Sequence, residues 1–241
     1  MRTAFSFYGG KGMLSSKYPP PKYKTIVEPF AGGAAYSLKY YNHDCILIEK
    51  NKDVCAVWEY IKNPNKKELE KIPQHITPGM KVSDFKIDNP AFINILRFAA
   101  NVGTGGTKKK METITKIGAK HFYKNTVQKI LFWTDKIKHW QIYNGDYFDF
   151  DFGEASYFID PPYQNQAGTL YKYGSKVIDY TNLKKYISTL KGQIIICENS
   201  ESEWIKDYEI NNLNRSCNVK AKHINKNRQS EVFIEIINRG G

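Results

Sequence analysis

The segment Thr25-Ile-Val-Glu-Pro-Phe-Ala-Gly-Gly33 decides the fold of this chain. Its short apolar run ends at a pair of glycines, and residues 34–41 then have the spacing of a helix. A second apolar run, residues 45–49, ends in an acid and precedes a helical stretch near 53–61. The order strand, glycine turn, helix, strand, helix is typical of the beginning of a parallel α/β sheet.

A different pattern occupies residues 63–139. Four prolines interrupt this segment, and helical stretches near 91–100 and 119–136 flank a polar loop at 101–110. We therefore predict a mostly helical insertion with these boundaries, 63–139.

The α/β pattern returns after the insertion. Strands are expected near 157–160, 193–198 and 231–237, and a helix near 180–190. We predict one Rossmann-like α/β domain built from residues 1–62 and 140–241.

Composition excludes several classes of protein. With 41% hydrophobic and 14% aromatic residues among 241, the chain has enough apolar surface to fold. It holds no apolar run long enough for a membrane span, and its beginning lacks the apolar region of a signal peptide, so we expect a cytoplasmic protein with no membrane partner. The cysteine spacing matches no zinc or disulfide pattern; Cys45 and Cys197 lie in apolar runs and are expected to be buried thiols.

The charge is strongly positive and unevenly distributed. The 36 Lys and Arg exceed the 24 Asp and Glu by 12. Nine lysines oppose two acids over residues 108–138, and five bases occur without an acid over 215–228, whereas five acids occur without a base over 146–160. This pattern indicates a polyanionic partner such as nucleic acid, the alternative being lysine-rich faces that only maintain solubility.

Asp160-Pro-Pro-Tyr163 directly follows an apolar run. Open α/β sheets bind ligands at the carboxyl ends of their parallel strands, where this tetrapeptide is expected. The two prolines fix the backbone and remove two donors, which leaves carbonyl oxygens and the Asp160 carboxylate as acceptors. Tyr163 adds an aromatic face for stacking. These groups suit the exocyclic amine of a nucleobase; the alternative is an ordinary turn at a strand end.

Residues 28–33 and Glu49 form a second candidate site. Glycines after the first strand let a ligand approach the backbone, and an acid after the second strand commonly holds a ribose diol. The segment Gly32-Gly33-Ala34-Ala35 matches neither G-x-G-x-x-G nor a P-loop. A nucleoside-bearing ligand without a deeply held pyrophosphate is therefore favoured.

Taken in order, five segments resemble the Dam-type adenine-specific DNA methyltransferases: Tyr8-Gly-Gly-Lys11, Glu28-Pro-Phe-Ala-Gly-Gly33, Glu49, Asp146 and Asp160-Pro-Pro-Tyr163. The resemblance implies an S-adenosylmethionine-dependent methyltransferase sheet, with the insertion 63–139 recognising the DNA target. It also implies transfer of a methyl group to the exocyclic amine of a flipped-out adenine in duplex DNA, without a metal. One departure is Ala34, where the family motif has a third glycine.

The resemblance further implies the roles of the site residues. Glu49 is expected on the ribose hydroxyls, and Asp146 near the adenine moiety with Tyr147 or Phe148 beside it. Asp160 and the Pro161 carbonyl are expected to accept the amine hydrogens, Pro162 to complete the rigid turn, and Tyr163 to stack on the flipped base. The remaining cofactor-binding residues that it implies are Tyr8, Lys11, Glu28, Phe30, Gly32 and Gly33.

For DNA we expect phosphate contacts from residues 108–110, that is Lys108, Lys109 and Lys110, and a second backbone clamp from Lys226 and Arg228. Base reading is assigned to Asn101, Thr104, Thr107 or the helix that begins near residue 119, with Arg97 a candidate for guanine.

Alternative functions remain open at this stage. They are methylation of the cytosine amino group or of adenine in RNA, and a non-catalytic DNA-binding protein on the same fold. The expected source is bacterial or phage-encoded, the expected state is a monomer or weak dimer, and a cognate restriction endonuclease is a candidate partner.

Overall fold

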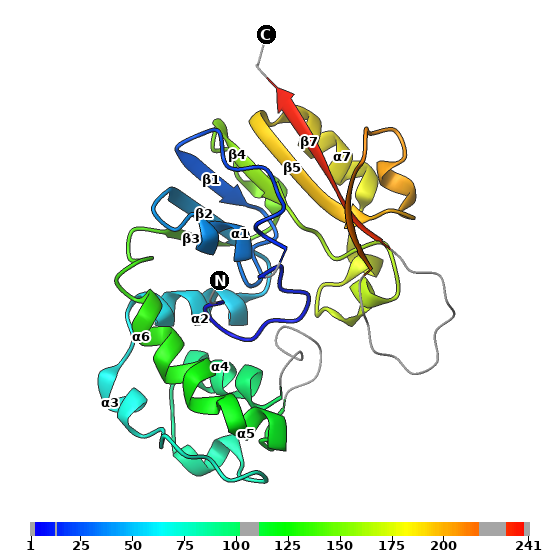
Figure 1. The fold of residues 1–241 in the computed structure, drawn as a ribbon. Coiled ribbons are helices and arrows are strands. Elements are labelled where there is room, and N and C mark those ends of the chain that lie inside the picture. Colours follow the sequence, from blue (N-terminus) through cyan, green and yellow to red (C-terminus); the bar gives the residue numbers. More distant parts are fainter. Residues whose placement is uncertain (1–2, 13, 102–110, 217–229, 239–241) are drawn as a thin grey trace.

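The computed structural model describes residues 3–12, 14–101, 111–216 and 230–238 (Figure 1). In this part of the chain seven strands form one mixed sheet, in the order β3-β2-β1-β4-β5-β7-β6. The strands are β1 (Thr25–Glu28), β2 (Asp44–Glu49), β3 (Gln141–Asn144), β4 (Glu154–Ile159), β5 (Lys191–Asn199), β6 (Asn211–Ser216) and β7 (Ser230–Asn238). The protein therefore has the predicted α/β fold.

Strands β1 to β5 run parallel, and β7 lies antiparallel between β5 and β6. From β1 the chain proceeds outward through β2 and β3, whereas β4 lies on the other side of β1 and leads outward to β5. The order of the sheet thus reverses between β1 and β4. In open α/β sheets a ligand binds outside the carboxyl ends of the strands at such a switch point.

Helices cover both faces of the sheet (Figure 1). Successive strand residues point to opposite faces, so Ile26 and Leu47 pack on one side, while Val27 and Ile48 pack on the other. The first side also holds Trp58 of α2. The helices are α1 (Ala35–Lys39), α2 (Lys52–Lys62), α3 (Lys66–Glu70), α4 (Pro90–Ala100), α5 (Lys116–Tyr123), α6 (Lys129–Trp133) and α7 (Tyr180–Thr189).

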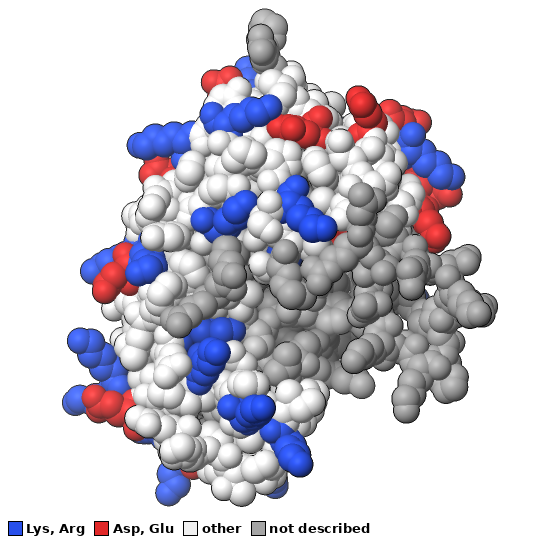
Figure 2. Space-filling model, viewed as in Figure 1, with Lys and Arg blue, Asp and Glu red and all other residues white. Residues whose placement is uncertain are grey.

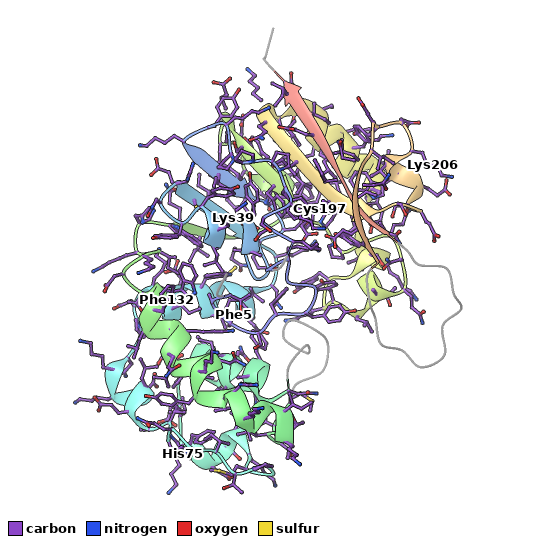
Figure 3. All side chains as sticks on the ribbon, viewed as in Figure 1. Phe5, Lys39, His75, Phe132, Cys197 and Lys206 are labelled. Carbon is purple, nitrogen blue, oxygen red and sulfur yellow. The ribbon has the colours of Figure 1, made fainter. Side chains whose placement is uncertain are left out.

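Helices α3 to α6 come from the segment between β2 and β3 and lie below the sheet in Figure 1. Their core is continuous with the core under the sheet. Phe5 of the N-terminal segment, labelled in Figure 3, contacts both Trp58 of α2 and Phe98 of α4 through its ring. These helices are therefore anchored to the sheet by shared apolar packing.

Three details differ from the sequence prediction. The helix expected over residues 119–136 runs from residue 116 to residue 133 and contains a π-helical turn, Lys124–Gln128, where the Thr126 hydroxyl donates to the Phe122 carbonyl at 2.8 Å. Strands β3 and β6 were not predicted, because neither contains an apolar run: β3 reads Gln-Ile-Tyr-Asn, and β6 is rich in Asn. The described residues include no helix that is long and apolar enough to cross a membrane.

Candidate functional site

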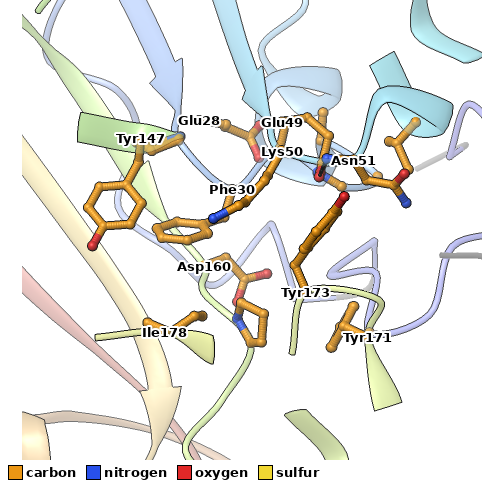
Figure 4. A pocket seen from close by; sticks show the side chains of 18 of the residues that line it. Glu28, Phe30, Glu49, Lys50, Asn51, Tyr147, Asp160, Tyr171, Tyr173 and Ile178 are labelled. Atoms are coloured by element: carbon orange, nitrogen blue, oxygen red, sulfur yellow. Dashed lines mark hydrogen bonds between the residues drawn. The ribbon is translucent and has the colours of Figure 1, made fainter. Parts of the chain in front are cut away.

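A cavity of about 300 Å³ opens at the carboxyl ends of β1, β2 and β4, beside the switch point of the sheet (Figure 4). Every residue expected to bind the cofactor lines it, although these residues come from five separate parts of the sequence. They are Tyr8, Lys11, Glu28, Phe30, Gly32, Gly33, Glu49, Asp146, Tyr147 and Asp160.

The turn after β1 brings the backbone close to the cavity. Gly32 has φ of +45°, and a Cβ on it would lie 2.7 Å from the Phe7 ring, so a side chain does not fit there. Its N–H donates to Glu49 Oε2 at 2.9 Å. Ala34 also has a left-handed backbone, with φ of 43°, and directly precedes α1. The departure from the glycine motif thus falls on a residue that keeps a glycine-like conformation.

Two carboxylates lie in the wall formed by β1 and β2. Glu49 Oε1 accepts from the Asn51 N–H at 2.8 Å, and Glu28 Oε1 accepts from the Ser37 N–H at 2.6 Å. Burial raises the pKa of Glu49, against the effect of the backbone donors, and raises the pKa of Glu28 to about 8. Neither residue pairs with a lysine in the described structure. Glu28 is mostly protonated at neutral pH because of its raised pKa, whereas the Glu49 carboxyl group is oriented at the cavity wall by the backbone donors.

The far end of the cavity combines charge with aromatic rings. Asp146 Oδ2 pairs with Lys50 Nζ at 2.6 Å, and its Oδ1 accepts from the Tyr147 N–H at 2.9 Å. The rings of Phe30 and Tyr147 lie 5.0 Å apart. Phe148 also lines the cavity and is 62% exposed. This end suits a planar ring with polar edges.

Asp160 follows β4 and faces the cavity from the opposite wall. Its Oδ1 forms an ion pair with Lys11 Nζ at 2.9 Å, and its side chain is 20% exposed. Burial raises the pKa of Asp160, and the ammonium group of Lys11 opposes the rise. Of the other predicted catalytic residues, Pro162 lines the cavity, whereas Pro161 and Tyr163 do not.

The segment between β4 and α7 supplies cavity residues that sequence reasoning missed. Tyr171 donates to the Tyr8 carbonyl at 3.1 Å, and Lys172 Nζ lies 3.2 Å from Asp53 Oδ2. Tyr173 also borders the cavity. This segment spans from the N-terminal loop to the start of α2. No motif marks these residues, and only the fold brings them to the site.

The predicted DNA contacts are only partly described. Arg97 is half-buried and pairs with Glu112, its Nε lying 2.6 Å from Oε1, and Asn101 lies at the end of α4. Thr104, Thr107, Lys108, Lys109, Lys110, Lys226 and Arg228 lie outside the described residues.

A basic stripe runs along α5 and the turn that follows it. The sequence prediction included these lysines only as part of the lysine-rich segment 108–138. Lys116, Lys120 and Lys124 are exposed and follow one another at intervals of four, which places them on one side of the helix. Figure 2 shows basic side chains over this helical segment, whereas acidic ones gather at the upper right.

No model of a known protein family matches the chain, and no curated protein is significantly similar to it. The function must therefore be argued from the chemistry of the cavity. Among the described residues five carboxylates and three ammonium groups line it, and no group of three or more His, Cys, Asp and Glu is placed to hold a metal ion. An acidic, aromatic cavity favours a cationic ligand with hydroxyl or amine donors over a polyphosphate.

Proposed function

We propose that this protein transfers the methyl group of S-adenosylmethionine to the exocyclic amine of adenine in duplex DNA. The observation that carries the proposal is the shared cavity at the switch point. Glu49 and Gly32 border it on one wall, and the Asp160 carboxylate borders it on the other. A nucleoside held by the first two groups has its reactive end facing the third.

The cavity fits S-adenosylmethionine in its chemistry. Glu49 is placed to accept from the ribose hydroxyls, Asp146 to accept from the adenine amine, and Phe30 to contact the adenine ring. Glu28 and the backbone at Gly32 are left for the methionine part. The excess of acidic over basic side chains in the lining suits the positive sulfonium and ammonium groups, even with Glu28 protonated. When bound, the cofactor supplies an activated methyl group.

In the proposed reaction Asp160 is the residue that contacts the target amine. Its carboxylate accepts a hydrogen from the target amine, orients the nitrogen and stabilises the positive charge that develops there. Lys11 favours the ionised form of Asp160, which burial disfavours. The ion pair with Lys11 thus favours the form of Asp160 that accepts a hydrogen from the reacting amine.

The basic stripe of α5 supports duplex DNA as the substrate. Lys116, Lys120 and Lys124 are spaced for contact with a polyanionic backbone. The target base has to leave the helix to reach the recessed Asp160 carboxylate, which requires base flipping.

Two variants separate cofactor binding from transfer. We expect Glu49→Gln to weaken S-adenosylmethionine binding at least tenfold in calorimetry, because a ribose acceptor loses its charge. Asp160→Asn should bind the cofactor within about threefold of wild type and lose methyl transfer. Glu59→Gln, on the exposed side of α2, is the control and should behave as wild type.

Full transfer by Asp160→Asn, or no cofactor binding by the wild-type protein, would contradict the proposal. Transfer of the methyl group to cytosine or to RNA would favour those alternative substrates. Cofactor-independent DNA binding alone would favour a non-catalytic protein.

A further inference from the structure

Glu231 lies behind the cavity at the beginning of β7, where it is 4% exposed and paired in register with Asn199 of β5. Its Oε1 accepts from the Tyr18 hydroxyl at 2.6 Å and from the Tyr163 hydroxyl at 2.9 Å. Lys11 Nζ lies 3.6 Å from the same oxygen. One buried carboxylate therefore holds two groups of the N-terminal segment, Lys11 and Tyr18, together with the distant Tyr163.

These groups in turn enclose Asp160. Lys11 lies 2.9 Å from Asp160 Oδ1 and 4.6 Å from the centre of the Tyr163 ring. The ammonium group is thus bracketed by two carboxylates and covers one face of the ring. A shift of Glu231 would free the Tyr163 hydroxyl and would leave Lys11 held by Asp160 and the Gly9 carbonyl alone, because both groups contact the same Glu231 oxygen.

The carboxylate of Glu231 does more than fill space between β7 and its neighbours. Backbone pairing from residue 231 to residue 238 already fixes β7 on β5. An apolar residue would leave two buried hydroxyl groups without their acceptor, and a neutral one would leave Lys11 with a single counter-charge. The charge of Glu231 therefore acts on the site through Lys11 and Tyr163.

We propose that Glu231 is a positioning residue for methyl transfer: it fixes Lys11 and Tyr163 around Asp160 and sets the charge environment of that carboxylate. This inference rests on the proposed function. Glu231 itself does not line the cavity and does not touch the substrate.

The negative charge of Glu231 favours the protonated form of Asp160. Burial is the main cause of the raised pKa of Asp160; Lys11 opposes the rise, and the negative charge of Glu231 adds to it. Glu231→Gln keeps an acceptor for the hydroxyls but removes the charge, so the pKa of Asp160 should fall. The titratable groups that face one another here, besides Glu231, are Lys11, Tyr18, Glu28, Asp160, Tyr163, Tyr171 and Cys197.

The test compares Glu231→Gln with Glu235→Gln, which lies on the same face of β7 and pairs with Lys22 at 2.9 Å, away from Asp160. We expect Glu231→Gln to lower kcat at least tenfold, to change the Kd of S-adenosylmethionine less than threefold, and to move the acid limb of the pH–kcat profile to lower pH. Tyr163→Phe should also lower kcat, and the double variant should be no worse than the poorer single one.

Glu235→Gln should match wild type in every readout. The inference would be overturned if Glu231→Gln kept the kcat of wild type, or if Glu235→Gln lost as much kcat as Glu231→Gln. It would also be overturned if the acid limb of the pH–kcat profile did not move in Glu231→Gln. Should Glu231→Gln fail to fold, Tyr163→Phe tests the same contact, and its wild-type kcat would overturn the inference as well.

A readout without catalysis separates this inference from the proposed function. NMR titration of ¹³C-carboxyl aspartate, with Asp160→Asn to assign the signal, reports the pKa of Asp160 directly. A lower pKa in Glu231→Gln but not in Glu235→Gln would support the positioning role even if wild type transferred no methyl to DNA, a result that would overturn the proposed function alone. An unchanged pKa would overturn the positioning role.

Discussion

Ala34 has φ of 43° and ψ of 48°, a conformation that costs a residue with a Cβ about 1–2 kcal/mol. Glycine at this position would remove that strain but would lose a buried methyl group and some rigidity of the unfolded chain. We therefore expect Ala34→Gly to change the free energy of unfolding by less than about 1 kcal/mol. Ala35→Gly, one residue further inside α1, should cost about 1–2 kcal/mol. Urea denaturation measures both, and a larger loss in Ala34→Gly than in Ala35→Gly would refute this interpretation.

Glu28 gives the site a pH-dependent stability. Its pKa is about 8 in the folded protein and about 4.3 in an unfolded chain. The folded state therefore binds more protons between these values, and its stability decreases as pH rises from about 4 to 8. Glu28→Gln should remove this dependence and gain stability relative to wild type, by on the order of 4 kcal/mol between pH 5 and pH 8. A stability difference that stays constant over this range would contradict the assignment.

At the residue scale the sequence predicted the groups that are fixed by their place at strand ends. Glu49 and Asp160 follow apolar runs, and parallel strands bring their carboxyl ends to one edge. The contact between Tyr163 and Glu231 had no such signal, because 68 positions separate them and β7 reaches Tyr163 only through antiparallel pairing with β5.

The docking of α5 on α4 depends on Gly118. A Cβ on this residue would lie 2.1 Å from the Ala100 carbonyl oxygen, so the backbones meet without room for a side chain. We expect Gly118→Ala to destabilise the protein by about 1–3 kcal/mol, although alanine favours helix. Lys120→Ala, exposed on the same helix, should stay within about 0.5 kcal/mol of wild type. Equal stability of the two variants in urea would show that α5 does not pack in this way.

The basic stripe of α5 predicts how DNA affinity depends on salt. Replacing Lys116, Lys120 and Lys124 by alanine should weaken binding to all duplexes alike and lower the slope of log K against log salt by about three, roughly one for each lysine–phosphate interaction. A matched triple variant of Lys185, Lys191 and Lys206 should leave both quantities unchanged. Fluorescence anisotropy over a salt series measures the affinity and the slope. An unaltered slope in the α5 variant would exclude this helix from the interface.

At the element scale the strong periodic segments were predicted well. Helices α2 and α4 lie within one residue of their expected bounds because their apolar faces are buried against the same core. The helix expected over 119–136 is present as one continuous helical run over 116–133, but the π-helical turn Lys124–Gln128 within it was not predicted, since neither proline nor glycine marks it. The polar edge strand β6 depends on its pairing with β7, which no local pattern indicates.

At the scale of the whole molecule, the segment between β2 and β3 adds helices α3 to α6, which pack on the core shared with α2 and do not interrupt the sheet. The change of pattern at residues 63 and 139 predicted a mostly helical insertion, and its role as a separate DNA-recognition domain stays a prediction. The sequence did not predict that the insertion shares a core with α2, or that the segment between β4 and α7 closes one side of the cavity. Both depend on contacts between distant parts of the chain, which periodicity does not report.

The most direct measurement of the central proposal is transfer of labelled methyl from S-adenosylmethionine to unmethylated duplex DNA, followed by nucleoside analysis. Wild type should place the label on the exocyclic amine of adenine, and Asp160→Asn should not. The account would be contradicted if wild-type protein bound the cofactor but labelled no nucleoside. It would also be contradicted if Asp160→Asn still labelled adenine.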